Sequence, residues 1–122
     1  MSTPAVAVVV EDDADIRSLL SAVLEQCGLA VQTAADGLAG VELVRAHTPV
    51  ITTLDVSMPG IDGFETARRI REFSDTHIFM VTARADDEHI RRGREAGADD
   101  YILKPFRPRE LRARVQAIVA AA

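Results

Sequence analysis

The sequence predicts one α/β domain built on a doubly wound, five-stranded parallel sheet. Short apolar runs alternate five times with longer segments whose apolar residues recur at helical spacing. The length of 122 residues fits a single domain over residues 1–122. Short parallel strands joined by helices require right-handed crossovers, so we expect helices on both faces of the sheet.

The first strand and helix have the clearest signals. Ala5 to Val10 is a continuous apolar run, typical of a strand buried on both faces. Apolar residues then recur at helical spacing from Ile16 to Leu24, and Gly28 is a suitable helix stop. The other strands are expected at Leu29–Thr33, Val50–Leu54, His77–Val81 and Tyr101–Leu103, and the other helices at Leu38–His47, Phe64–Phe73, Asp87–Ala96 and Pro108–Val119.

The predicted topology places the functional site before any motif is considered. In doubly wound sheets a site forms beyond the carboxyl ends of the strands, where the strand order reverses. For the order 2-1-3-4-5 this point lies between the first and third strands. The residues that follow these two strands are all acidic: Glu11, Asp12 and Asp13 follow the first, and Asp55 follows the third.

Such a cluster of carboxylates indicates a bound cation. Two carboxylates about 4 Å apart repel by about 1 kcal/mol in water, and by more near a protein surface. Mg2+ resolves this repulsion because it prefers a few carboxylates together with water and phosphate oxygens. Asp13 is expected to cap the first helix, and Asp62 the third.

Two further strand ends carry groups that bind phosphate oxygens. Thr82 follows the fourth strand and offers a hydroxyl donor, and Lys104 follows the fifth strand and offers a positive charge. Each residue alone says little. Together with the carboxylates they form a constellation suited to a phosphoryl group.

Composition excludes several other classes of protein. The formal net charge is -5, which argues against a nucleic-acid-binding surface. No apolar run approaches the roughly 20 residues of a membrane helix, and the start lacks a basic stretch followed by a cleavage site. We therefore expect no membrane contact and a cytoplasmic location.

The whole chain resembles a response-regulator receiver domain of two-component signalling systems, a family with a flavodoxin-like (βα)5 fold. The segments that carry this resemblance are Val8 to Asp13, Leu54 to Gly63, Val81 to Ala83, Gly97 to Tyr101 and Leu103 to Phe106.

The resemblance implies a phosphoacceptor signalling domain that assists its own phosphorylation and dephosphorylation but is not an enzyme in the usual sense. A histidine kinase would transfer a phosphoryl group to Asp55. Mg2+ would be bound directly by Asp12, Asp55 and the backbone carbonyl of Ser57, and largely through water by Glu11. Thr82 and Lys104 would hold the phosphoryl oxygens, and the Lys104-Pro105 peptide bond would be cis.

The resemblance also implies a switch in which Thr82 acts together with Tyr101 on the fifth strand to control an output such as transcription. Residues Gly97 to Val115 resemble the subfamily whose receivers precede a winged-helix DNA-binding domain and pair through the fourth helix, fifth strand and fifth helix. Arg94 and Arg112 stand where that subfamily usually has apolar contact residues, and Ile90 stands where a charged residue is usual. We therefore expect a weak homodimer.

Three other interpretations fit the residues less well. A flavin carrier of the same topology needs hydroxyl and glycine donors after the first strand, where this chain has acids. A phosphohydrolase with an aspartate nucleophile needs an acid or base two residues later, where this chain has Ser57. A scaffold module would not need the complete motif. The histidines His47, His77 and His89 are expected in surface or capping positions.

Overall fold

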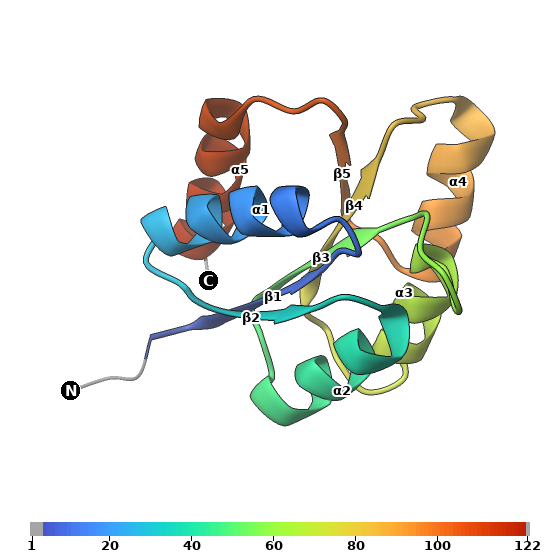
Figure 1. Ribbon diagram of the computed structural model, residues 1–122, viewed down its shortest axis with the longest axis horizontal. Helices are drawn as coiled ribbons and strands as arrows, with labels where there is room; N and C mark the ends of the chain where they lie inside the picture. The colour runs from blue at the N-terminus through green and yellow to red at the C-terminus, as the bar shows by residue number, and fades with distance from the viewer. Residues whose placement is uncertain (1–3, 122) are drawn as a thin grey trace.

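Five parallel strands form one sheet in the order β2-β1-β3-β4-β5, as predicted, in a computed structural model that describes residues 4–121 (Figure 1). The strands are β1 (Val6–Val10), β2 (Ala30–Ala34), β3 (Ile51–Asp55), β4 (His77–Thr82) and β5 (Asp100–Leu103). The helices are α1 (Ala14–Gln26), α2 (Gly37–His47), α3 (Gly63–Arg71), α4 (Asp87–Ala96) and α5 (Pro108–Ala121).

The sheet separates two apolar cores because successive side chains of a strand point to opposite faces. In β1, Ala7 and Val9 pack into the core beneath α1 and α5, whereas Val8 and Val10 pack into the core beneath α2, α3 and α4. Figure 1 shows α1 and α5 side by side on one side of the sheet and α2 and α3 on the other. The continuous apolar run in β1 therefore reflects burial on both faces.

Three strands, β2, β3 and β4, end one residue later than predicted, and for β3 and β4 the difference matters for the site. β3 extends to Asp55 and β4 extends to Thr82, whereas the apolar pattern ended at Leu54 and Val81. Asp55 is paired with Val81 in the sheet, and Thr82 is paired with Leu103. Because these residues belong to the sheet, their backbones are fixed by strand pairing.

Helix caps fix the chain where it leaves the sheet. Asp13 Oδ1 accepts hydrogen bonds from the amides of Asp15 (2.9 Å) and Ile16 (3.1 Å), and Asp62 Oδ1 accepts one from the amide of Glu65 (2.9 Å). Both capping predictions are confirmed. The Asp13 cap starts α1 shortly after the end of β1, and the Asp62 cap starts α3 at the end of the loop that follows β3.

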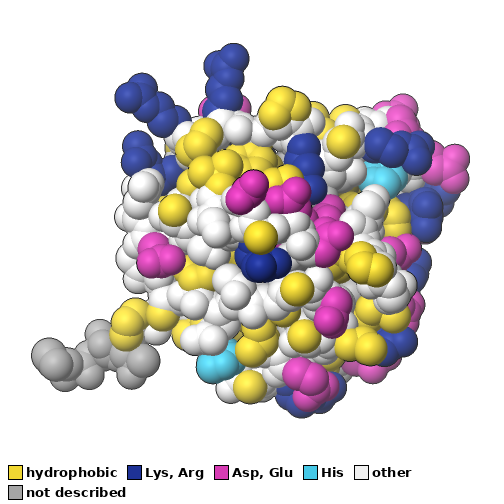
Figure 2. Space-filling model, viewed as in Figure 1, with side chains coloured by type: hydrophobic (Ala, Val, Ile, Leu, Met, Phe, Trp, Pro, Cys, Tyr) yellow, Lys and Arg dark blue, Asp and Glu magenta, His cyan; other side chains and the backbone are white. Residues whose placement is uncertain are grey.

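The surface on the side of the molecule shown in Figure 2 mixes acidic, basic and apolar side chains, without one large charged region. Within residues 4–121, no helix has both the length and the apolar character that a membrane span needs.

Gly63 allows α3 to start against the end of β3. A Cβ atom at position 63 would lie 2.5 Å from the carbonyl oxygen of Asp55 and 2.8 Å from the Cα of Val56. We expect Gly63→Ala to lower the free energy of unfolding by about 1–3 kcal/mol, since the clash is with backbone that the sheet holds in place. Urea denaturation measures this change. Ser18→Ala, an exposed substitution on α1, serves as control and should change it by less than about 0.5 kcal/mol.

Candidate functional site

Three carboxyl groups converge at the carboxyl ends of β1 and β3, where the sequence predicted the site. Glu11 and Asp12 directly follow β1, and Asp55 is the last residue of β3. One carboxylate oxygen from each residue lies within 4.8 Å of the other two. The parallel pairing of β1 with β3 brings these groups together, because it aligns the ends of the two strands.

The three acids differ strongly in exposure. The Glu11 residue is 0% exposed and Asp55 is 5% exposed, whereas Asp12 is exposed to solvent. Glu11 Oε2 accepts a hydrogen bond from the amide of Asp13 at 3.2 Å. Its other oxygen, Oε1, is buried and accepts no hydrogen bond from the part of the chain that the structure describes. Glu11 therefore presents a buried oxygen with unused capacity to bind a cation.

Lys104 supplies a positive charge to this cluster from the end of β5. Its Nζ lies 3.4 Å from Asp55 Oδ1 and 3.4 Å from Glu11 Oε1. The Lys104 amide donates to the carbonyl of Thr82 at 2.8 Å, which fixes the start of the loop. The Lys104-Pro105 peptide bond is cis, as the resemblance implied.

Burial and the neighbouring charges shift the pKa values of Glu11, Asp55 and Lys104. Desolvation by burial raises the pKa of Glu11 to about 7, and the neighbouring Asp55 adds to this rise. Burial also raises the pKa of Asp55, although Glu11 and the Lys104 charge oppose it. For Lys104, desolvation is outweighed by the charges of Asp55 and Glu11, and its pKa is raised. Burial thus disfavours the ionised forms of Glu11 and Asp55, and the charge of Lys104 offsets only part of this effect.

Ser57 and Thr82, the two other residues predicted to bind the metal or the phosphoryl group, line the same hollow, which has a volume of about 300 Å³. Ser57 lies at its edge, and its amide approaches Asp55 Oδ1 at 3.4 Å. Thr82 lines the hollow at the end of β4, but its hydroxyl is occupied. Oγ1 accepts a hydrogen bond from the Arg84 amide at 3.1 Å and shares another with His89 Nε2 at 3.0 Å.

The prediction that His89 occupies a surface or capping position is wrong. Only 6% of this residue is exposed, and its ring packs edge-on against Phe64 with the ring centroids 5.2 Å apart. The buried residues of α4 are His89, Gly93 and Ala96, which recur at helical spacing. Gly93 and Ala96 are the small residues of this strongly charged helix, and His89 lies on the same face, one turn before Gly93. This spacing was the signal that could have placed His89 on the buried face.

Tyr101 contacts the same helix. Its hydroxyl donates to the carbonyl of Ile90 at 2.8 Å and lies 3.2 Å from the carbonyl of His89. The side chain fits because residue 93 is glycine: a Cβ atom there would lie 1.7 Å from the tyrosine hydroxyl. Thr82 and Tyr101 therefore both bind α4 in its first turns: Thr82 contacts the ring of His89, and Tyr101 contacts the backbone carbonyl of the next residue, Ile90.

The donor set of the acidic cluster fits a hard divalent cation. Carboxylates are the protein ligands that Mg2+ and Ca2+ prefer, and a hard cation would bind Oε1 of Glu11, which accepts no hydrogen bond from residues 4–121 and faces only the Lys104 ammonium group at 3.4 Å. A lysine ammonium group alone leaves two of three negative charges uncompensated when all three acids ionise.

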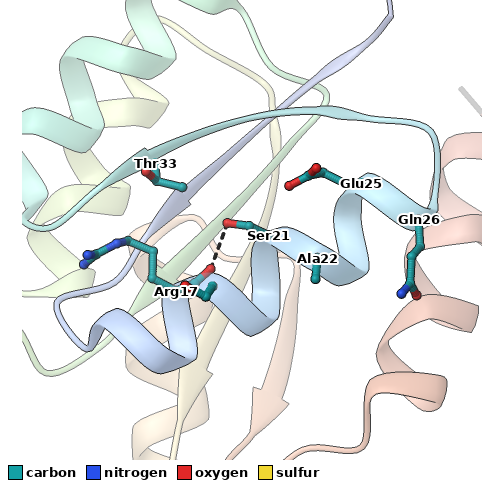
Figure 3. A pocket seen from close by; sticks show the side chains of 7 residues that line it. Arg17, Ser21, Ala22, Glu25, Gln26 and Thr33 are labelled. Carbon is teal, nitrogen blue, oxygen red and sulfur yellow. Dashed lines mark hydrogen bonds between the residues drawn. The ribbon is translucent and has the colours of Figure 1, made fainter.

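A larger surface hollow of about 650 Å³ lies over α1 and β2 (Figure 3). Its main polar groups are already used in the fold: the Ser21 hydroxyl donates to the Arg17 carbonyl at 2.8 Å, and Arg17 Nη1 donates to the Glu11 carbonyl at 2.9 Å. The smaller hollow with its buried acids is therefore the better candidate site.

Known proteins resemble the chain over most of its length. Residues 7–116 match the family described as response regulator receiver domain. The transcriptional regulatory protein CseB of Streptomyces avermitilis is 47% identical over 110 residues, which cover 90% of this chain and 47% of CseB. The DNA-binding response regulator MtrA of Mycolicibacterium paratuberculosis is 41% identical over 109 residues, which cover 89% of this chain and 48% of MtrA. The chain spans about half the length of these relatives.

Solved structures agree with this match. The BeF3-activated receiver domain of DrrB aligns with a TM-score of 0.86 and 36% identity, covering 97% of this chain and 99% of that one. A longer structure of DrrB, an OmpR/PhoB homologue from Thermotoga maritima, aligns with a TM-score of 0.87 and 36% identity, covering 98% of this chain and 54% of that one. Together with the acidic site at the sheet edge, these matches show that the chain belongs to the response regulator receiver domain family of two-component systems.

Proposed function

We propose that the chain is a phosphorylation-controlled switch in which Asp55 accepts a phosphoryl group from a histidine kinase. The observation that supports this most directly is the position of Asp55, which is held at the end of β3 within reach of two acids and of the Lys104 ammonium group. A carboxylate oxygen of Asp55 forms the bond to phosphorus while the bond between phosphorus and the donor's leaving group breaks.

The remaining residues bind and orient the reacting groups. Asp12, Asp55 and the backbone carbonyl of Ser57 would hold Mg2+, with Glu11 acting largely through water. When bound, Mg2+ would neutralise the charge on the phosphoryl oxygens. Lys104 would bind one phosphoryl oxygen and Thr82 another. Because these residues surround the acceptor without any contribution from the kinase, the domain would assist its own phosphorylation and dephosphorylation.

Phosphorylation would act on α4, β5 and α5. The phosphoryl group adds a charge of roughly -1.5 to -2 and three strong acceptor oxygens, which attract the Thr82 hydroxyl. Since Thr82 and Tyr101 both contact α4, movement of Thr82 would bias Tyr101 and the surface around it. The output would be control of transcription, because relatives such as CseB are named transcriptional regulators.

The charges on this surface favour a weak homodimer. Arg94 is exposed on α4, as expected. The expectation that Arg112 lies on the same surface is wrong, since its guanidinium donates to Gln26 Oε1 of α1 at 3.3 Å. Asp100, which could pair with a partner molecule, is bound within the chain by Arg114 at 3.1 Å. Pairing would therefore require desolvation of Arg94 and loss of an internal ion pair.

Asp55→Asn should abolish phosphorylation by a small phosphodonor with Mg2+, since the amide is a poor nucleophile. The wild-type domain should gain one acid-stable, hydroxylamine-labile phosphoryl group, measured by mass spectrometry, and a chelator should prevent this gain. Asp15→Asn, which changes an exposed aspartate of α1, should leave phosphorylation unchanged. Phosphorylation of Asp55→Asn at the wild-type rate would assign the acceptor to another residue.

Asp12→Ala should weaken Mg2+ binding by at least about ten-fold, because loss of even an outer partner of a metal ligand costs about 10- to 100-fold. Isothermal titration calorimetry measures this affinity. Without metal, the free energy of unfolding should stay within about 0.5 kcal/mol, since Asp12 is exposed and packs against no apolar core. Unchanged Mg2+ affinity would show that Asp12 is not a direct ligand. Asp15→Ala is the matched control.

Arg94→Leu should strengthen self-association of the activated domain. A two-fold symmetric interface would bring the Arg94 side chains of both molecules close together, and the substitution removes both charges. Sedimentation velocity with beryllium trifluoride and Mg2+ compares wild type, Arg94→Leu and the control Arg112→Val. The control should behave like wild type, since Arg112 reaches toward α1. If the wild-type domain forms dimers as tight as those of Arg94→Leu, the prediction is wrong.

A further inference from the structure

The hydroxyl group of Thr82 is engaged before any phosphoryl group arrives. Its oxygen accepts a hydrogen bond from the Arg84 amide at 3.1 Å, and His89 Nε2 lies 3.0 Å away. We propose that His89 is a positioning residue that binds the hydroxyl proton of Thr82 and competes for it with the phosphoryl oxygens. This inference rests on the proposed function, because it concerns how Thr82 becomes free to bind those oxygens.

The partners of the Thr82 hydroxyl are consistent with its donating to His89. A threonine hydroxyl has one proton to donate, and the Arg84 amide already donates to its oxygen. Among residues 4–121, His89 Nε2 is the acceptor within hydrogen-bond distance of this hydroxyl. In the proposed arrangement the shared proton lies on Thr82, so that the imidazole accepts at Nε2 and carries its own proton at Nδ1. A phosphoryl oxygen, which can only accept from Thr82, needs that same hydroxyl proton.

The surroundings of His89 keep the ring neutral and in place. Desolvation lowers its pKa, and so do the charges of Arg84 in the loop before α4 and Arg92 on α4 itself; Asp86 at the helix cap opposes them. From α3 the ring meets Phe64, which carries no charge. A neutral ring keeps the lone pair of Nε2 available to Thr82, and burial prevents water from replacing it.

The same residue joins the two side chains of the proposed switch. The ring of His89 binds Thr82 on β4, and its carbonyl oxygen lies 3.2 Å from the Tyr101 hydroxyl of β5, which donates to the next carbonyl of α4, that of Ile90, at 2.8 Å. When the Thr82 hydroxyl exchanges its acceptor, from His89 Nε2 to a phosphoryl oxygen, the start of α4, to which Tyr101 is bound, is released from β4. His89 thus opposes activation and couples the two side chains.

Beryllium trifluoride, a tetrahedral mimic of an aspartyl phosphate, tests this competition in the folded domain with Mg2+. The chain has one tyrosine and no tryptophan, so the fluorescence of Tyr101 reports binding. His89→Leu should bind the mimic about two- to ten-fold more tightly than wild type, the effect of one net neutral hydrogen bond. His89→Gln, whose side-chain oxygen can still accept from Thr82, should stay close to wild type.

A double-mutant cycle separates competition from a structural effect. In a Thr82→Ala background, where the contested proton is absent, His89→Leu should leave the affinity unchanged. An equal gain in that background, or an unchanged or weaker affinity of His89→Leu in the wild-type background, would overturn the proposal.

Nitrogen NMR of the unmodified domain tests the same bond without a substitution. Nε2 of His89 should be unprotonated in the free domain and should lose the Thr82 bond when the mimic binds. A proton on Nε2 in the free domain contradicts the proposal. Failure of the wild-type domain to bind the mimic counts instead against the proposed phosphoryl acceptor, and the protonation state of Nε2 still tests the Thr82–His89 bond.

Discussion

Electrostatic repulsion at the carboxyl edge of the sheet is the constraint on which the rest of the structure depends. Glu11 is fully buried beside Asp55, and within residues 4–121 the nearby ammonium group is that of Lys104, 3.4 Å from each. Two unit charges about 4 Å apart interact by about 4 kcal/mol at the effective dielectric of a protein surface. Such a site is costly in the empty domain and becomes favourable when a cation and phosphoryl oxygens enter it.

The fold supports this arrangement with rigid elements. Asp55 and Thr82 are the last residues of paired strands, and the two acids after β1 are followed at once by the Asp13 cap of α1. Apolar packing on both faces of the sheet holds these strand ends in position. The charged groups therefore cannot relax by moving apart, and the repulsion is relieved only by ligands or by shared protons.

The side of the sheet that carries α4 connects the site to the surface. α4 is strongly charged, and its buried residues include a histidine and a glycine beside the small Ala96. Gly93 makes room for the Tyr101 hydroxyl, and His89 binds the Thr82 hydroxyl. The helix is therefore held to β4 and β5 largely by polar contacts, which a change of charge at Asp55 can exchange more readily than apolar packing.

The sequence by itself determined the five alternating strands and helices and which acids, lysine and threonine stand at the strand ends. The strand order came from the doubly wound fold class, and the structure agrees with it. The elements and their end residues follow from local rules, because apolar periodicity defines the elements and residues at strand ends meet at the sheet edge. The spacing of Gly93 and Ala96 marks one face of α4, but only the tertiary structure packed that face against β4 and so brought His89 to Thr82. It also turned Arg112 toward α1 and paired Asp100 with Arg114 within the chain. Long side chains on amphipathic helices have several partners within reach, and the choice among them depends on how neighbouring elements pack.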